Sequence, residues 1–193
     1  MNKPIQKRAI ATREKLLSTA RALIDQEGFE ALRVEDLVRT AGVAKGTFFA
    51  HFKDKDALME QIIGARLAEI SAEADQAPAP QNVAEMVATL NPLIAFMTSE
   101  RYVFDVILRY SGAAAISEIG PIAEQFTVQG ELFARWVAQG PFRKDIPADL
   151  AGDGIGAFLI QSIALTFCAL HCSSAIEPRL ATYLDAWLLP SGA

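Results

Sequence analysis

The chain has 193 residues, a hydrophobic share of 51% and a formal net charge of −5. This length allows one hydrophobic core, or a small domain joined to a larger one. The negative net charge argues against a protein whose whole surface is basic and binds nucleic acid. The charge is uneven: residues 1–56 hold 11 Lys or Arg and 8 Asp or Glu, whereas residues 57–193 hold 7 and 15. A basic front on an acidic body is typical of a nucleic-acid-binding segment on a soluble scaffold, although an excess of three charges is weak support.

The N-terminal stretch is basic and has no apolar core, so we expect no signal peptide and a cytoplasmic location. The two cysteines, Cys168 and Cys172, lie close together, offer no disulfide framework and favour a reducing compartment. Residues 154–172 lack Asp, Glu, Lys and Arg and approach the ~20 residues that span a bilayer. They contain Gln161, Ser162 and His171, so we expect a helix buried against its own domain and a partner chain, and no membrane.

Helical periodicity begins near residue 7 and predicts a first helix over residues 7–27, which Gly28 ends in the left-handed conformation. A second helix follows over residues 34–41, and Gly42 makes the turn after it. Helix, short helix and tight glycine turn are typical of the helix-turn-helix motif.

The third helix lies in AGVAKGTFFAHF, residues 41–52, and is about two turns long. A helix this short is not stable alone, so its aromatic side must hold it while the other side is presented to a partner. Asp54 is a suitable N-cap for a longer fourth helix.

After a Pro/Ala boundary at residues 77–80, every later segment still has a helical pattern, with no alternating β pattern and no internal repeat. We therefore predict an all-α protein of about nine helices. A three-helix helix-turn-helix domain over residues 1–54 is joined by the fourth, linking helix to a helical bundle within residues 55–193. The later helices are expected over residues 82–98 (bent at Pro92), 100–110, 121–139, 149–172 and 178–189.

Several spaced motifs between residues 13 and 67 resemble the N-terminal domain of TetR-type transcriptional regulators. They include Gly28-Phe29-Glu30-Ala31, Val34-Glu35-Asp36-Leu37, Ala41-Gly42-Val43, Lys45-Gly46-Thr47, His51-Phe52 and Lys55-Asp56-Ala57-Leu58. The resemblance covers a little over a quarter of the chain and says little about residues beyond about 75. It implies that the third helix enters the major groove of DNA.

A helix-turn-helix presents the N-terminal part of its second helix to base edges. Lys45 can donate to guanine or phosphate, Thr47 can meet a base or the sugar-phosphate backbone, and Gly46 permits close backbone approach. Merely solvated polar residues are the alternative, which the resemblance makes the weaker one. DNA contacts are expected from Arg33, Ala44, Lys45, Gly46, Thr47, Phe49, Ala50, His51 and Lys55.

Three of these positions depart from the family pattern. Arg33 stands where Ser or Thr commonly caps the second helix, so a cap worth about 1 kcal/mol is lost, but its guanidinium can reach a phosphate or the minor groove. Phe49 replaces a frequent Tyr, and Ala44 replaces a common Ser. Together they predict fewer hydrogen bonds to the DNA backbone.

Aromatic residues recur across the middle helices of the body. The resemblance implies an inducer cavity there, closed off from water and mostly apolar, although a filled core is the alternative for each residue. The set suits a small apolar or aromatic effector, with Arg109, Glu131 and Arg135 as possible polar anchors. The predicted pocket residues are Phe96, Tyr102, Phe104, Tyr110, Phe126, Phe133 and Trp136.

Cys168 and Cys172 share one helical face, and His171 lies about 100° from Cys172. A thiolate metal site or redox switch stays open, but these residues supply too few ligands without a partner chain, so we expect packed thiols, no metal and no cofactor.

The last two predicted helices have more apolar surface than one small domain needs, so a homodimer interface is expected between copies. A twofold dimer would set the two recognition helices about 34–36 Å apart, matching successive major grooves. The predicted interface residues are Gly156, Phe158, Leu159, Ile163, Phe167, Tyr183, Leu184 and Trp187.

Two functions are compatible with these patterns. The first is a homodimeric repressor that holds a pseudo-palindromic DNA operator and leaves it when a small, largely apolar ligand binds the body and tilts the fourth helix. The second is a helical enzyme or ligand-binding protein whose N-terminal bundle is only structural. Two histidines and the lack of nucleophile, metal and phosphate-loop motifs argue against an enzyme.

Overall fold

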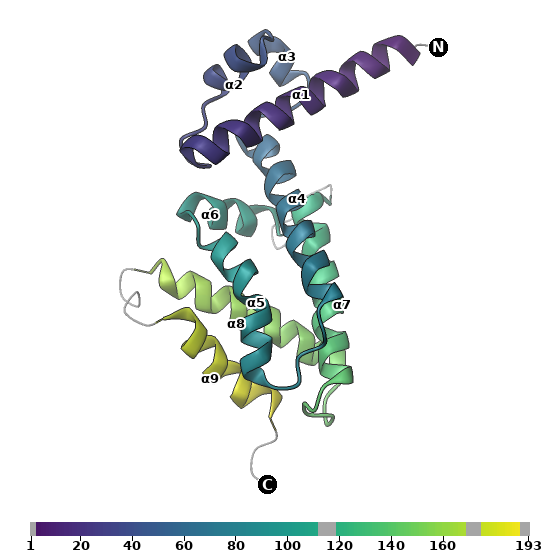
Figure 1. Cartoon of the computed structure of the whole chain (residues 1–193), viewed down its shortest axis with the longest axis vertical. Coiled ribbons are helices and arrows are strands. Elements are labelled where there is room, and N and C mark those ends of the chain that lie inside the picture. Colours follow the sequence, from purple (N-terminus) through teal and green to yellow (C-terminus); the bar gives the residue numbers. More distant parts are fainter. Residues whose placement is uncertain (1–2, 112–118, 169–174, 190–193) are drawn as a thin grey trace.

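The computed structural model describes residues 3–111, 119–168 and 175–189 of the chain (Figure 1). Over these ranges the chain forms nine α-helices and no strand, which confirms the all-α prediction. The helices divide in space into a small N-terminal group and a larger bundle, and one long helix runs from the first group into the second (Figure 1).

The N-terminal group consists of α1 (Lys3–Glu27), α2 (Val34–Ala41) and α3 (Lys45–Phe49). The first begins earlier than predicted, and the second has the predicted bounds. Gly28 and Gly42 have φ values of 90° and 64°, the left-handed conformation expected of both. The N–H groups of Gly42 and Val43 donate to carbonyls in the last turn of α2, which ends the helix and aims α3.

The linking helix is α4 (Lys55–Gln76), and its N-cap is Asp54, as predicted. The Asp54 carboxylate accepts a hydrogen bond of 2.8 Å from Ala57 N. This helix contacts α1 at one end and α5, α6 and α7 along the body. This helix therefore connects the N-terminal group with the body.

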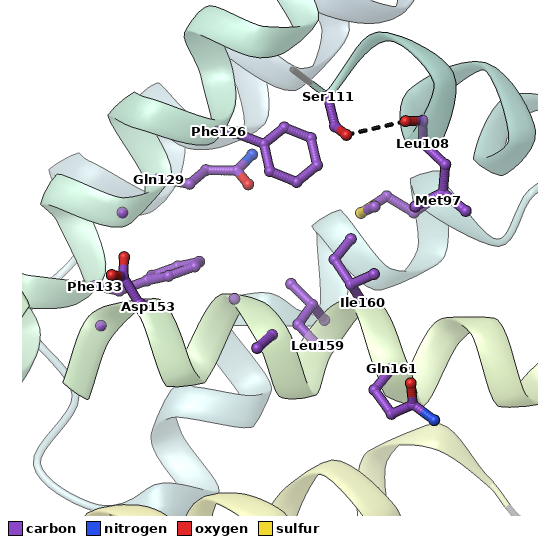
Figure 2. Close-up of a pocket in the computed structure, with 14 residues that line it drawn as sticks. Met97, Leu108, Ser111, Phe126, Gln129, Phe133, Asp153, Leu159, Ile160 and Gln161 are labelled. Carbon is purple, nitrogen blue, oxygen red and sulfur yellow. Dashed lines mark hydrogen bonds between the residues drawn. The ribbon is translucent and has the colours of Figure 1, made fainter. Parts of the chain in front are cut away.

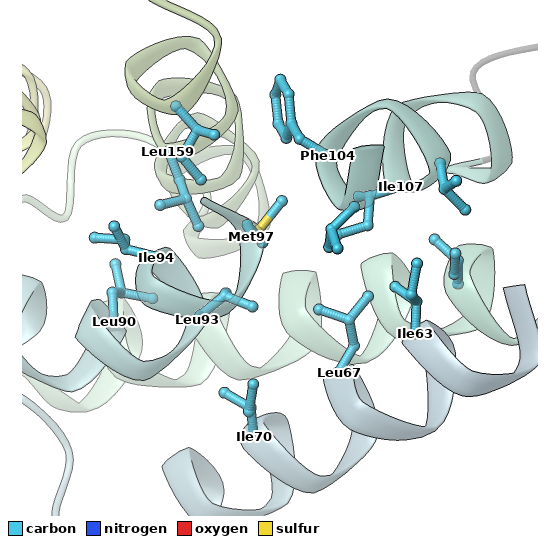
Figure 3. Packing of buried hydrophobic residues seen from close by; sticks show 14 of the residues in the cluster. Ile63, Leu67, Ile70, Leu90, Leu93, Ile94, Met97, Phe104, Ile107 and Leu159 are labelled. Atoms are coloured by element: carbon cyan, nitrogen blue, oxygen red, sulfur yellow. The ribbon is translucent and has the colours of Figure 1, made fainter. Parts of the chain in front are cut away.

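The body is formed by α5 (Val83–Met97), α6 (Arg101–Tyr110), α7 (Pro121–Gln139), α8 (Ala148–Thr166) and α9 (Ile176–Leu188). The long α7 packs along α4 and α8, and α9 covers α8 and α5. Side chains from four helices meet in the core, among them Leu67, Ile94, Ile107 and Leu159, and all are buried (Figure 3).

The prediction of a single helix to residue 172 is wrong, because α8 ends at Thr166. There Cys168 N donates to Leu165 O at 3.2 Å, a tighter turn than the α-helix makes. The Phe167 ring stacks on Phe104 with centroids 5.6 Å apart, which anchors this end to α6. Residues 169–172 of the predicted helix, with His171 and Cys172, lie outside the described residues.

Within the described ranges, α8 alone is long and apolar enough to cross a bilayer, with a mean hydropathy of 1.2. It packs between α7 and α9, and Ile155, Leu159 and Ile163 are buried there. Only 33% of its apolar window is buried within the described chain, so the predicted burial against a partner chain as well stays a prediction.

Candidate functional site

The short helix α3 has one buried and one exposed side. Phe48 is fully buried and Phe52 nearly so, and their ring centroids are 5.6 Å apart. Lys45, Gly46 and Ala50 are exposed, and Phe49 keeps 50% of its surface accessible. Thr47 and His51 are partly buried. The helix is therefore held by two phenylalanines, and it presents a small, weakly polar surface with one cationic side chain.

The ammonium of Lys45 lies beside a carboxylate of the neighbouring helix. Lys45 Nζ is 2.6 Å from Glu35 Oε1, and both side chains are more than half exposed. The hydrogen bond from Lys45 holds the pKa of Glu35 below its ordinary value. Because an exposed ion pair contributes little stability, Lys45 can exchange this partner for a phosphate or a base edge at small cost. The motif did not reveal this pair.

Both short helices begin without a side-chain cap. Arg33 is the N-cap of α2, Ala44 is the N-cap of α3, and neither side chain makes a capping hydrogen bond. The loss of these caps agrees with the predicted departures from the family pattern. Both residues are exposed, Arg33 at the start of α2 and Ala44 at the start of α3.

The position of Lys55 argues against the phosphate contact predicted for it. Its Nζ donates to Glu30 O at 2.9 Å and lies 4.5 Å from the centroid of the Tyr102 ring. Partial burial lowers the pKa of Lys55. Its ammonium is thus directed into the junction between the N-terminal helices and α6, away from the exposed side of α3.

At the same junction, the Glu100 carboxylate of the body binds backbone N–H groups in the turn after α1. Glu100, the N-cap residue of α6, accepts hydrogen bonds from Phe29 N at 2.7 Å and from Glu30 N at 2.8 Å. A Cβ on Gly28 would lie only 2.7 Å from Glu100 Oε1, so a side chain at this position would displace the carboxylate in addition to straining the positive φ. Adjacent backbone N–H groups form a nest for the anion. Sequence patterns gave no sign of this contact.

A second link joins α6 to the start of α4. The Tyr102 hydroxyl donates to Asp56 Oδ1 at 2.6 Å, and Arg109 pairs with the other oxygen of the same carboxylate. Burial, together with the hydrogen bond to Asp56, raises the pKa of Tyr102, so the phenol stays protonated and donating. Helix α6 therefore holds both the α1–α2 turn and the first turn of α4.

A cavity of about 540 Å³ opens between α7 and α8, beside Met97 and the C-terminal end of α6 (Figure 2). Its walls are mostly apolar. The described residues that line it are Met97, Leu108, Ser111, Phe126, Gln129, Gly130, Phe133, Gly152, Asp153, Gly156, Ala157, Leu159, Ile160 and Gln161.

Only Phe126 and Phe133 of the seven predicted pocket residues line this cavity. Phe96 instead packs edge-on against Phe29 at the junction, with centroids 6.0 Å apart. Tyr102 binds Asp56, and Phe104 stacks on Phe167. Trp136 is buried in the core, and the partly buried Tyr110 packs against the core. These five aromatic residues follow the filled-core alternative or stabilise the junction.

The predicted dimer surface is also smaller than expected. Leu159, Ile163 and Leu184 are buried within the chain and leave no side-chain surface for a partner, and Gly156 lines the cavity. Phe167 packs on Phe104. Phe158, Tyr183 and Trp187 remain as a partly exposed aromatic cluster, in which the Phe158 centroid is 5.2 Å from Tyr183 and 6.0 Å from Trp187.

No group of three or more His, Cys, Asp or Glu that could hold a metal occurs in the described part of the chain. Cys168 is partly buried, while Cys172 lies outside the described ranges. The redox or metal role considered for this pair is left untested.

Comparisons with known proteins agree with the helix-turn-helix geometry. Residues 16–62 match the sequence model described as "Bacterial regulatory proteins, tetR family". The HTH-type regulator YvdT of Bacillus subtilis is 31% identical over 52% of this chain and 52% of its own length. The HTH-type repressor KstR of Mycobacterium tuberculosis is 26% identical over 69% of this chain and 61% of its own. The chain thus spans roughly half of the curated relatives' length, and their names describe regulators rather than enzymes.

The fold is shared more widely than the sequence. RolR, solved with the ligand resorcinol, has a TM-score of 0.68 at 19% identity, covering 94% of this chain and 90% of RolR. FadR of Thermus thermophilus, a TetR-family repressor solved with lauroyl-CoA, has a TM-score of 0.65 at 19% identity, covering 91% and 92%. The match at residues 16–62 therefore shows an N-terminal segment of the tetR type of bacterial regulatory proteins, and the described chain shares its overall fold with the two solved structures.

Proposed function

We propose that this protein is a ligand-responsive transcriptional repressor that binds double-stranded operator DNA through α3. The exposed side of α3 supports the proposal most directly. Its exposed residues are Lys45, Gly46, Phe49 and Ala50, and the buried Phe48 holds the helix against the N-terminal group. Gly46 has no neighbouring atom within 4 Å of where a Cβ would stand, so the backbone there is open to a groove. Arg33 and Ala44 are also exposed, at the first residues before α2 and α3. A cytoplasmic location, where DNA is accessible, goes with this proposal.

The operator would be bound by a homodimer through two half-sites. The cluster of Phe158, Tyr183 and Trp187 on α8 and α9 supports this part of the proposal, because partly exposed aromatic groups are frequent anchors of interfaces. A twofold axis beside these helices would present one α3 from each chain, and a pseudo-palindromic site would match that symmetry.

Ligand control is proposed from the cavity and its position beside α6. Met97 and Leu108 line the cavity, whereas Glu100 and Tyr102, near the other end of α6, hold the N-terminal helices. A ligand that favours a different position of α6 would change the angle of the N-terminal group and reduce operator affinity, provided that it binds the two states unequally. The solved complexes of RolR with resorcinol and FadR with lauroyl-CoA make such a ligand plausible here.

Selection of genomic duplexes by the purified chain, followed by titration of the best duplex in rising salt, tests the DNA-binding step. Affinity should fall steeply with salt, and Lys45→Ala should weaken binding and reduce the salt slope by about one unit. Arg66→Ala is the control, because Arg66 pairs with Glu69 within α4, away from α3. No preference for any duplex over random DNA would favour the alternative of a purely structural N-terminal bundle.

A further inference from the structure

We propose that the cavity between α7 and α8 selects compact aromatic or apolar molecules that have a hydrogen-bond donor and no negative charge, with Gln129 and Asp153 as the polar anchors. The inference rests on the proposed ligand response and adds the chemical class of the ligand. The volume of about 540 Å³ falls within the range of ordinary small-molecule sites.

The charge around the cavity disfavours anions. Asp153 is the single ionisable residue among its described lining residues. Residues 112–118, which the structure does not describe, contain no Lys or Arg in their sequence. An anionic ligand would therefore meet a carboxylate and find no cation in the wall.

The Lys and Arg residues of the body make contacts within the protein. All seven Lys and Arg residues between positions 57 and 193 have partners within the protein, and none of them is among the described residues that line the cavity. Five pair with carboxylates and two donate to backbone carbonyls: Arg66 with Glu69, Arg101 with Asp105, Arg109 with Asp56, Arg135 with Asp75, Arg143 with Asp145, Lys144 with Val137, Ala138 and Gly140, and Arg179 with Ser162.

Gln129 is the buried anchor. It is only 8% exposed, and its Nε2 donates to Ser71 Oγ at 3.2 Å, which fixes the amide. Its Oε1 accepts none of the hydrogen bonds found among the described residues, and the amide extends into the cavity toward the Phe126 ring (Figure 2). An acceptor that faces the cavity can take a hydrogen bond from a ligand, so a ligand that donates there gains affinity.

Asp153 lines the same cavity from α8. A Cβ on Gly130, the residue after Gln129, would be 4.0 Å from Asp153 Oδ1, so the carboxylate stands at the same part of α7. Phe133 and Asp153 both line the cavity (Figure 2). A cavity lined by two acceptors and two aromatic rings suits a donor on an aromatic skeleton, and the exposed carboxylate adds a moderate preference for a cation.

Three probes of one skeleton test the inference by calorimetry on the full chain: 2-phenylethanol, 2-phenylethylamine and phenylacetate. The alcohol and the amine should bind about tenfold or more tightly than phenylacetate. Gln129→Met, which keeps the side-chain volume but removes the acceptor, should weaken binding of both donors.

Asp153→Asn should lower the preference for the amine over the alcohol by about two- to fivefold, as expected for an exposed charge pair. The control is Asp149→Asn, on the same helix but outside the cavity lining, which should leave this ratio unchanged. Phenylacetate binding as tightly as the amine, or no binding of any probe at millimolar concentration, would overturn the inference. Operator binding is measured separately with the same preparations, so a failure of DNA binding is told apart from a failure of this ligand class.

Discussion

Replacement of Glu100 by Ala should loosen the N-terminal helices from the body and destabilise the fold by about 2 kcal/mol. The carboxylate accepts a partly buried hydrogen bond from Phe29 N at 2.7 Å and an exposed one from Glu30 N at 2.8 Å. A hydrogen bond to a charged group contributes about 1.5–3 kcal/mol, and water replaces much of the exposed one. For a chain of this size, a loss of about 2 kcal/mol lowers Tm by about 4–8 °C.

Thermal unfolding and hydrogen exchange at residues 28–31 measure this effect together. The Phe29 and Glu30 amides should lose protection in Glu100→Ala, because their acceptors are removed and the turn opens locally. Glu69→Ala is the matched control, since Glu69 pairs with Arg66 on the surface of α4 and should change stability little. The junction argument is refuted if Glu100→Ala has the Tm and exchange pattern of that control.

Three further substitutions test separate parts of the structure. Gly64→Ala gains about 1 kcal/mol of helix propensity, but its Cβ would stand 2.7 Å from Pro121 Cβ and 3.0 Å from the Pro121 carbonyl carbon. Because overpacking costs about 1–3 kcal/mol, we expect a net loss of stability in urea denaturation, and a more stable variant would contradict the close crossing of α4 and α7. Glu35→Gln frees Lys45 and removes a negative charge beside α3, so fluorescence anisotropy should show tighter binding to duplex DNA at low salt; unchanged binding would mean that Lys45 does not approach DNA. Partial burial raises the pKa of Glu60 above 4.5, so its ionisation destabilises the folded state increasingly as pH rises from 4.5 through the folded pKa. Glu60→Gln should therefore raise Tm slightly at pH 7 and not below pH 4, and a Tm difference independent of pH would exclude this cause.

The helices were predictable because their signals are local. The bounds of α2 and α7 agree with the predicted ranges, and Asp54 caps α4 as expected. The end of α8 was misplaced because residues 167–172 continue the apolar, uncharged pattern of the helix. The contact that holds Phe167 is with Phe104 on another helix, and no window of sequence contains it.

The cavity was predicted in kind but not in detail. Seven aromatic residues on the middle helices were candidates, yet only Phe126 and Phe133 of these seven line the cavity between α7 and α8. An aromatic side chain has the same periodic signal whether it fills a core or lines a cavity, because both positions are buried. The polar residues that distinguish this cavity, Gln129 and Asp153, had no motif to single them out.

The sequence by itself determined the helical class, the two left-handed glycine turns and the amphipathic α3, because these depend on residues within a few positions of one another. Only the tertiary structure decided which residues contact each other across helices. Glu100 binds the turn after Gly28, Lys55 lies over the Tyr102 ring, and Lys45 forms an ion pair with Glu35. Each of these contacts joins residues on different helices. Their partners are therefore chosen by how the helices pack, and the spacing of residues along the chain does not encode that choice.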